Sequence, residues 1–289
     1  MESVKHLQDY DIDTRFPATV IASERITPEE SQEEVREIVL EISRPDFEYQ
    51  VGQSIGVVAP GGEEFGAKSH FRLYSVADLP EKKGKKQRIK IAVRRCFYVD
   101  EYSGESYPGI ASNYLCDLKP GDEIQIAGPF GLVFEVPREA NANLILIGSG
   151  TGIAPFRAFV KHIYHHVEDW HGRIWLFYGA RSGLELLYMN RWKDDFTQYY
   201  DREMFEAFRA VSPRPHWADP IAWDRAMEER SAELWKLFGL SNTYVYVAGI
   251  DKMLVELDQV FSKIAGSAEL WNRRKAELRA GGRWVELVY

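Results

Sequence analysis

Few cysteines, no long apolar run and no excess of positive charge are the first features of this sequence. Only Cys96 and Cys116 occur in 289 residues, with no CxxC pair and no metal-ligand spacing, so we expect a reducing compartment, the cytoplasm, and no metal site. No apolar run approaches the roughly 20 residues that span a bilayer. The acidic N-terminal stretch lacks the apolar segment of a signal peptide. The net charge of −8 disfavours a nucleic-acid or membrane-surface partner.

Short strand-like runs, by contrast, fill the first half of the chain. Turn signals separate them, such as Pro60-Gly61-Gly62 and Pro120-Gly121. Short strands at this spacing predict an antiparallel β-barrel. The expected strands are 17–27, 36–43, 53–60, 70–78, 88–95 and 123–131.

The pattern changes after about residue 137. A continuous apolar run, "ANLILIGSG", ends in glycines and is followed by apolar residues at helical spacing over 156–167. Two further buried strands are expected at 173–182 and 242–251. Buried strands that alternate with helices predict a doubly wound α/β domain. We therefore place an antiparallel barrel domain at 1–137 and a doubly wound α/β domain at 138–289.

Three loops follow the expected parallel strands. They read "GSGTGIAP" (148–155), "GARSG" (179–183) and "AGIDKM" (248–253). Ligands of doubly wound sheets bind beyond the carboxyl ends of the strands. Glycines there let the backbone approach a phosphate, although a glycine-rich turn alone is weak evidence. Three such loops together indicate a dinucleotide site.

The residues after the second strand bear on the choice of nucleotide. NAD-selective sites usually carry Asp or Glu near the ribose hydroxyl, whereas Arg181 and Ser182 stand here. Ser212 and Arg214 in "AVSPR" are further candidates. We expect these four side chains to hold the 2′-phosphate of NADP; the alternative is that they are solvated surface residues.

Two motifs of the barrel half carry polar and aromatic residues in a regular pattern. In "RLYS" (72–75) a strand would place Arg72 and Tyr74 on one face and Leu73 and Ser75 on the other. In "SNYLCDLKPGD" (112–122), Ser112 is predicted to cap a short helix whose start would bind a phosphate.

With these motifs in order, the sequence resembles the plant-type ferredoxin–NADP+ reductase family over nearly its whole length. Some features are closer to bacterial members, including reductases that serve multicomponent oxygenases. The resemblance implies an FAD-binding Greek-key barrel followed by a nicotinamide-nucleotide domain. The matching segments are 52–56, 72–75, 93–98, 109–131, 150–159, 233–235, 242–249 and the terminal aromatic residue.

The resemblance also implies roles for residues on the FAD side. Arg72 would neutralise the pyrophosphate, Tyr74 would stack on the isoalloxazine, and Ser75 would hydrogen-bond near flavin N5. Tyr98 would stack on the adenine, and Ser112 would bind phosphate. The rest of the implied FAD-binding set is Leu73, Ile110 and Ala111.

On the nicotinamide side, the resemblance places Thr151 with Gly150 and Gly152 against the nucleotide. Arg94 would lie near its phosphates. Tyr289 would cover the other flavin face and move aside when the nicotinamide arrives.

Two positions beside the hydride-transfer centre depart from the family. Ala248 stands where the family usually has Cys, and Leu287 where it usually has Glu. Glu286 is one residue away, on the opposite face of a strand, so it cannot simply replace the missing carboxylate. The candidate catalytic positions are Ser75, Tyr289, Ala248 and Glu286. Either hydride transfer survives, or the chain binds FAD without ordinary reductase activity.

The implied function is an FAD-dependent oxidoreductase that takes a hydride from NADPH at flavin N5 and exchanges electrons with ferredoxin or flavodoxin. The alternatives are a reductase component of a multicomponent oxygenase and a flavin-binding regulator with little nicotinamide activity. A basic cluster is either a solvated turn or a docking patch for the carrier. Its lysines are Lys82, Lys83, Lys85 and Lys86.

His162 and His166 lie one helical turn apart, a spacing that two metal ligands sometimes have. No carboxylate or third ligand accompanies them in the sequence, so we interpret them as part of an exposed helix face.

Overall fold

The computed structural model describes residues 11, 13–61, 69–100, 102–131, 134–199, 204–215 and 219–288. The chain forms two compact units, Met1–Leu132 and Val133–Tyr289. This division precedes the expected boundary at 137 by a few residues, because Phe134 belongs to the second unit. Its ring packs against Phe156 and Tyr246, with centroids 5.5 and 5.3 Å away.

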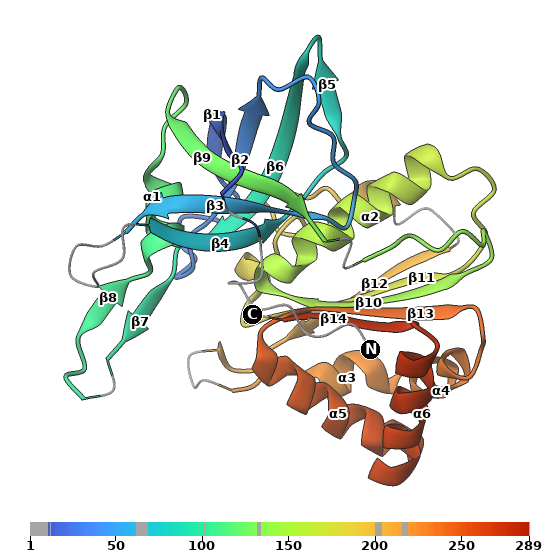
Figure 1. Cartoon of the computed structure of the whole chain (residues 1–289). Helices are drawn as coiled ribbons and strands as arrows, with labels where there is room; N and C mark the ends of the chain where they lie inside the picture. Colours follow the sequence, from blue (N-terminus) through green and yellow to red (C-terminus); the bar gives the residue numbers. More distant parts are fainter. Residues whose placement is uncertain are drawn as a thin grey trace. The chain divides into compact units, whose positions relative to one another are not determined.

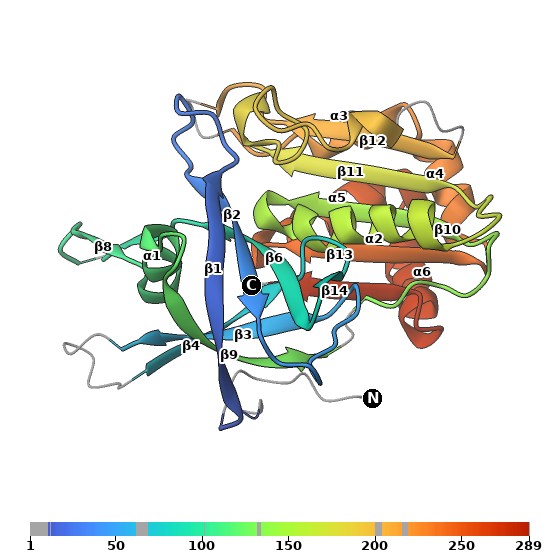
Figure 2. The same cartoon turned by 90° about the horizontal axis from the view of Figure 1, so that it is seen from above.

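The first unit is an antiparallel seven-stranded sheet in the order β4-β3-β9-β1-β2-β6-β5. Figure 2 shows β1 running between β2 and β9, its partners in the sheet. An antiparallel bridge between Val76 and Ile91 joins the end of β4 to β6 and closes the sheet into a barrel. The strands are β1 Arg15–Arg25, β2 Val35–Ile42, β3 Ser54–Pro60, β4 Ser69–Ser75, β5 Glu81–Lys83, β6 Lys86–Arg94 and β9 Glu123–Phe130.

Alternation of apolar and polar residues explains the barrel core. On β1, Phe16, Ala18 and Val20 are buried, whereas their neighbours Arg15 and Pro17 are exposed. This period of two sends one face of each strand inward. Apolar side chains from the other barrel strands fill the same core, including Ile55, Val57 and Ile91.

A small hairpin and one helix complete the first unit. The hairpin consists of β7 (Phe97–Val99) and β8 (Ser106–Pro108), and it stands out from the barrel in both views (Figures 1 and 2). Helix α1 (Ile110–Asp117) follows it directly and packs Leu115 and Cys116 into the barrel core. The Gly109 N–H donates to the carbonyl of Cys96 at 2.9 Å, so the residue before β7 lies beside the start of α1.

The second unit is an all-parallel five-stranded sheet in the order β12-β11-β10-β13-β14. Helix α2 covers one face, and α3, α5 and α6 lie on the other (Figure 1). The strands are β10 Asn143–Ser149, β11 Ile174–Ala180, β12 Phe205–Val211, β13 Thr243–Gly249 and β14 Trp284–Val288. The helices are α2 Ile153–His166, α3 Trp223–Glu228, α4 Ser231–Phe238, α5 Asp251–Ala265 and α6 Ala268–Ala280.

The central strands β10 and β11 are buried at every position, as expected for strands covered on both faces. A core of large aromatic residues lies under α5 and α6, where Trp271 contacts Phe261 and Trp284. The antiparallel barrel and the doubly wound α/β domain predicted from sequence are both confirmed. Among the described residues, no helix is both long enough and apolar enough to cross a membrane.

Candidate nucleotide-binding sites

Strand β4 carries the "RLYS" motif and pairs with β3 in antiparallel register. Arg72 lies opposite Val57 and Tyr74 opposite Ile55, so both side chains leave the sheet on the same face. Tyr74 packs against the barrel core, and burial raises the pKa of its hydroxyl, which therefore stays protonated at neutral pH. A flat apolar ring with a hydrogen-bond donor at its tip suits a flavin.

Arg72 is exposed, and its Nη1 donates to the Phe71 carbonyl at 2.9 Å. Within the described ranges no carboxylate forms an ion pair with it. An arginine whose charge is unmatched is a suitable partner for a pyrophosphate. Ser75 ends the strand opposite Ser54, and Leu73 lies opposite Gly56.

The start of α1 differs from the prediction in one detail. The helix begins at Ile110, two residues before Ser112, and its N-cap is Gly109, without a side-chain cap hydrogen bond. The Ser112 hydroxyl donates to the Gly109 carbonyl and accepts from the Cys96 backbone N–H, both at 3.2 Å. The prediction of Ser112 as N-cap is therefore wrong. The first-turn N–H groups, those of Ile110 and Ala111 included, keep their capacity to bind a phosphate.

Tyr98 lies on the hairpin strand β7, opposite Tyr107 of β8. The two rings stack with centroids 5.4 Å apart and planes inclined by 21°. Tyr98 is 47% exposed, so one face of its ring is covered by Tyr107 and the rest is accessible to a base such as adenine.

The second unit changes chain direction between β10 and β13. The chain leaves β10 outward to β11 and β12, and then returns to β13 on the other side. Such a switch point at the carboxyl ends of parallel strands is where dinucleotides bind. Gly148 and Ala248 are register partners there, so loops 148–155 and 248–253 flank one position.

The geometry at this switch point fits a nucleotide. The 3₁₀ turn η3 (Gly150–Gly152) has Gly150 at φ 54°, a conformation that favours glycine. A Cβ on Gly152 would lie 2.2 Å from the Ala248 carbonyl oxygen, so only glycine permits this approach. The Ser149 hydroxyl is buried, and within the described residues nothing hydrogen-bonds to it. A buried hydroxyl without a partner at this loop is suited to a polar ligand atom.

Tyr178 of β11 fixes the glycine turn from behind. Its hydroxyl donates to the Gly150 carbonyl at 2.9 Å and accepts from the Leu187 N–H at 3.1 Å, and the residue is fully buried. Thr151 therefore lies in a turn that the Tyr178 hydroxyl holds in place by a hydrogen bond to Gly150.

The four predicted 2′-phosphate ligands do lie at one edge of the sheet. Ala180 and Val211 are register partners at the ends of β11 and β12. Arg181 and Ser182 therefore leave the sheet beside Ser212, whose N–H donates to the Ala180 carbonyl at 3.3 Å.

Three of these four side chains have partners inside the chain. The Ser182 hydroxyl donates to Glu185 Oε1 at 3.3 Å. The Ser212 hydroxyl is buried and donates to the Asp219 carbonyl at 2.9 Å. Arg214 forms an ion pair with the Asp219 carboxylate.

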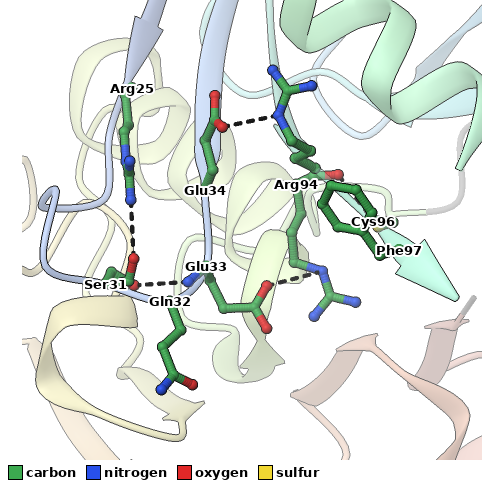
Figure 3. Close-up of a pocket in the computed structure, with 9 residues that line it drawn as sticks. Arg25, Ser31, Gln32, Glu33, Glu34, Arg94, Cys96 and Phe97 are labelled. Atoms are coloured by element: carbon green, nitrogen blue, oxygen red, sulfur yellow. Dashed lines mark hydrogen bonds and ion pairs between the residues drawn. The ribbon is translucent and has the colours of Figure 1, made fainter. Parts of the chain in front are cut away.

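Arg94 lines a cavity of about 380 Å³ in the first unit (Figure 3). Its Nε lies 3.6 Å from Glu33 Oε2. The neighbouring Arg95 pairs with Glu34 and Asp117, at 2.9 Å in both cases. The cavity is lined by polar side chains of both signs, so the charge of Arg94 is partly balanced by acids.

The two departures from the family lie side by side. Leu287 on β14 is the register partner of Ala248 on β13, and Ala248 is fully buried. Neither side chain can transfer a proton. The register therefore joins the two substituted positions into one apolar spot at the switch point.

Glu286, one of the candidate catalytic positions, contacts the neighbouring elements instead. Its carboxylate accepts from Arg279 at 2.7 Å and from Trp284 Nε1 at 2.6 Å, and lies 3.5 Å from Lys275 Nζ. Burial alone would raise the pKa of Glu286, but these hydrogen bonds and cations outweigh it and hold the pKa below its usual value. Tyr289, the remaining candidate, lies outside the described residues.

Comparison with known proteins agrees with both units. The model of an oxidoreductase FAD-binding domain matches residues 23–134, and that of an oxidoreductase NAD-binding domain matches residues 146–258. The chloroplastic ferredoxin--NADP reductase leaf isozyme 1 of Oryza sativa subsp. indica is 35% identical over 253 residues, which are 84% of this chain and 68% of that protein. The chain belongs to the ferredoxin–NADP reductase family.

Another ferredoxin–NADP reductase, leaf isozyme 1 of Arabidopsis thaliana, is 33% identical over 283 residues, which are 95% of this chain and 77% of that protein. The fold likewise matches the solved ferredoxin-NADP+ reductase of Plasmodium falciparum, with a TM-score of 0.72 at 20% identity over 97% of this chain and 98% of that chain. The family membership confirms an oxidoreductase with FAD-binding and nicotinamide-nucleotide-binding domains.

Several residues at these sites carried no signal in the sequence. Asp219 and Glu185 are acids in loops whose course only the fold determines, and Tyr178 looked like any buried strand residue. The only hint of Ser149 was its place between the glycines of "GSGTG". The His162 and His166 rings lie 5.4 Å apart, and the described residues place no group of three metal-ligating side chains together.

Proposed function

We propose that this chain transfers electrons between NADPH and ferredoxin, with FAD as its bound cofactor. One observation carries the proposal. A barrel strand that presents Arg72 and Tyr74 is joined, in one chain, to a parallel sheet whose switch point carries the glycine turn 150–152. Relatives with this order of domains are named ferredoxin--NADP reductases.

The first unit supplies the FAD site. Arg72 and the first-turn N–H groups of α1 bind the phosphates, and Tyr74 stacks on the ring system, with Ser75 near flavin N5. Tyr98 stacks on the adenine, and Leu73 completes the lining. When bound, FAD accepts a hydride from a nicotinamide and exchanges electrons singly with a carrier.

The second unit orients the nicotinamide nucleotide. Gly150 and Gly152 let the backbone approach the nucleotide, and Thr151 faces it. The buried hydroxyl of Ser149, which has no partner among the described residues, is available for a hydrogen bond to it. Ala248 and Leu287 supply neither acid nor base. Residues of this site therefore act by orientation and by exclusion of water, which are large effects in such reactions.

The terminal residues have separate roles in this proposal. Tyr289, which lies outside the described residues, keeps in this proposal only the flavin-covering role that the family resemblance implies. Glu286 positions strand β14 through Arg279 and Lys275 rather than taking part in proton transfer.

The carrier docks, in this proposal, on the basic hairpin of β5 and β6. Lys82 forms an ion pair with Glu48 and Lys86 with Glu41. Lys83 and Lys85 are exposed, and within the described residues no carboxylate pairs with them. These two ammonium groups are the better placed to meet an acidic ferredoxin or flavodoxin. We keep the cytoplasm as the proposed location, although the relatives named above are chloroplastic.

The test is reduction of a carrier by the purified protein. With NADPH as donor, we expect FAD-dependent reduction of ferredoxin, followed through cytochrome c, and the same assay with flavodoxin measures carrier preference. Flavin reduction without transfer to either carrier contradicts the carrier assignment. Failure of NADPH and NADH to reduce the bound flavin supports a flavin-binding regulator instead.

A further inference from the structure

The carboxyl end of β12 holds a cation that is already matched by an acid of its own loop. Arg214 Nε lies 2.8 Å from Asp219 Oδ2, and Arg214 Nη2 lies 3.4 Å from Asp219 Oδ1. Two contacts between one guanidinium and one carboxylate fix their relative orientation. Arg214 is also one of the two cations, with Arg181, that the sequence predicted for the 2′-phosphate of NADP.

Asp219 is the anchored partner of this pair. Its carbonyl accepts from the Ser212 hydroxyl at 2.9 Å, and Ser212 is only 4% exposed. Ser212 is in turn bonded through its N–H to the end of β11 at Ala180. The Asp219 side chain is 21% exposed and that of Arg214 68%, so the carboxylate is held near the sheet edge and the arginine extends outward.

A second carboxylate stands at the same edge. Glu185 accepts from Ser182, which lies two residues after the end of β11. Acids at this position of a dinucleotide fold accept hydrogen bonds from a ribose 2′-hydroxyl and repel a 2′-phosphate. The edge therefore combines the cation that a 2′-phosphate needs with acids that oppose it.

We propose that Asp219 is a specificity-determining residue for the nicotinamide nucleotide. It occupies Arg214 and opposes the 2′-phosphate, so the chain accepts nucleotides with a free 2′-hydroxyl as well as those with a 2′-phosphate. Neutralising Asp219 releases Arg214 and shifts the preference towards NADPH. This inference rests on the proposed function, because it concerns the nucleotide that the same site uses.

The experiment isolates the adenosine end of the nucleotide. Binding of adenosine 2′,5′-bisphosphate and of 5′-AMP to the FAD-loaded protein is measured by calorimetry at one fixed ionic strength. We expect Asp219→Asn to bind the bisphosphate about tenfold more tightly, since one repulsive charge is removed and one cation is freed. Binding of 5′-AMP is expected to stay unchanged.

Asp224→Asn is the matched control, because it removes the same charge from the exposed start of α3. It is expected to alter neither affinity. Because Ser212 bonds to the backbone carbonyl of residue 219, Asp219→Asn keeps that anchor, and Asp219→Ser serves as a second replacement. Thermal melting of each variant establishes that it is folded.

Arg214→Gln tests whether Asp219 acts through the arginine. In this background we expect Asp219→Asn to improve bisphosphate binding by less than in the parent. An equal improvement in both backgrounds overturns the claim that Asp219 occupies Arg214. A bisphosphate-to-AMP affinity ratio that Asp219→Asn leaves unchanged overturns the specificity assignment while the proposed function stands. Failure of both probes to bind, with no flavin reduction by NADPH or NADH, overturns both.

Discussion

The arginines predicted to bind phosphate differ in whether an acidic side chain lies beside them. The arginine proposed for FAD has no such neighbour in the described part of the chain, whereas two of those proposed for the nicotinamide nucleotide do. Arg72, on the FAD side, donates to a backbone carbonyl and has no acid partner among the described residues. Arg94 of the first unit and Arg214 of the second, both proposed to bind the nicotinamide nucleotide, lie beside Glu33 and Asp219. A bound cofactor needs tight phosphate contacts, whereas a nucleotide that must leave needs weaker ones. The presence or absence of acids beside these arginines agrees with that difference.

In our proposal, the acids beside Arg94 and Arg214 lower the affinity for the nicotinamide nucleotide without abolishing it. Exposed ion pairs are worth about 0–1 kcal/mol each, so an incoming phosphate displaces them at small cost. A nucleotide that binds and leaves in each turnover is served by such weak, exchangeable contacts. In the same proposal FAD stays bound, and Arg72, which has no acid partner among the described residues, would hold its pyrophosphate more strongly.

The largest expected effect is a loss of FAD affinity when Arg72 is replaced. Arg72→Ala should weaken FAD binding about a hundredfold, because charge-assisted hydrogen bonds are worth about 1.5–3 kcal/mol. FAD affinity is measured by fluorescence titration of the FAD-free protein. Arg44→Ala, which removes a charge from the same unit but pairs with Asp46, is the control and should change affinity little. Equal losses in both variants would contradict the role of Arg72.

The next effect concerns close approach at the glycine turn. Gly152→Ala should weaken NADPH binding about tenfold and destabilise the fold by about 1–3 kcal/mol, because its Cβ meets the Ala248 carbonyl oxygen at 2.2 Å. Binding is measured by difference absorbance and stability by denaturant unfolding.

Gly172→Ala is the matched control for that variant. Its Cβ would lie 1.8 Å from the Ala142 carbonyl oxygen, away from the carboxyl ends of the strands. It should destabilise the protein while leaving the NADPH affinity of the folded fraction intact. Loss of affinity in both variants would mean that strain, rather than the nucleotide site, explains the effect.

Replacing Glu286 tests whether its carboxylate stabilises the second unit rather than taking part in catalysis. Its pKa is lower in the folded chain than its usual value of 4.5. Such a group stabilises the fold above pH 4.5, and this stability is lost as the pH falls through the lower folded pKa. Glu286→Gln should therefore cost about 1–2 kcal/mol at pH 7 and progressively less below pH 4.5.

Unfolding in urea at pH 7 and pH 4 measures this difference. The exposed Glu269 at the start of α6 is the control, and Glu269→Gln should stay within about 0.5 kcal/mol of the parent. A stability loss that does not depend on pH would exclude the ion pairs as its cause. A large loss of flavin reduction at unchanged stability would return Glu286 to the catalytic set.

The smallest effect concerns the basic hairpin. The double variant Lys83→Gln, Lys85→Gln should slow carrier reduction about threefold at low salt, with the difference vanishing at high salt. Lys82→Gln, Lys86→Gln changes the net charge equally, but those ammonium groups already contact Glu48 and Glu41. Equal slowing by both pairs would indicate a long-range field rather than direct contact, and no slowing by either removes the docking patch.

The fold was predictable because it rests on repeated, local signals. Alternating burial along β1 and unbroken burial along β10 distinguish a half-buried barrel strand from a central parallel strand. Strand β12 gave no comparable signal, since it lies at the sheet edge and is only partly buried. Helix α6 was also missed, because it buries only Trp271, Lys275 and Leu278 and carries many charged residues.

The candidate sites were predictable only in part, for a similar reason. Glycines and the "RLYS" motif mark positions where the backbone or a strand face meets a ligand. The pairing of Arg214 with Asp219 depends on how the loop after β12 folds back, which no local pattern encodes. Ser112 is not the predicted cap because Gly109, three residues earlier, follows the hairpin and is the N-cap of the helix.

Rapid mixing of the FAD-loaded protein with NADPH, without oxygen, tests most directly whether one chain joins a flavin site to a nicotinamide site. We expect the visible absorbance of the flavin to bleach in a single turnover with NADPH and, at comparable concentrations, with NADH. A flavin that stays oxidised with both nucleotides would contradict the proposed function, whatever the affinity of the chain for FAD.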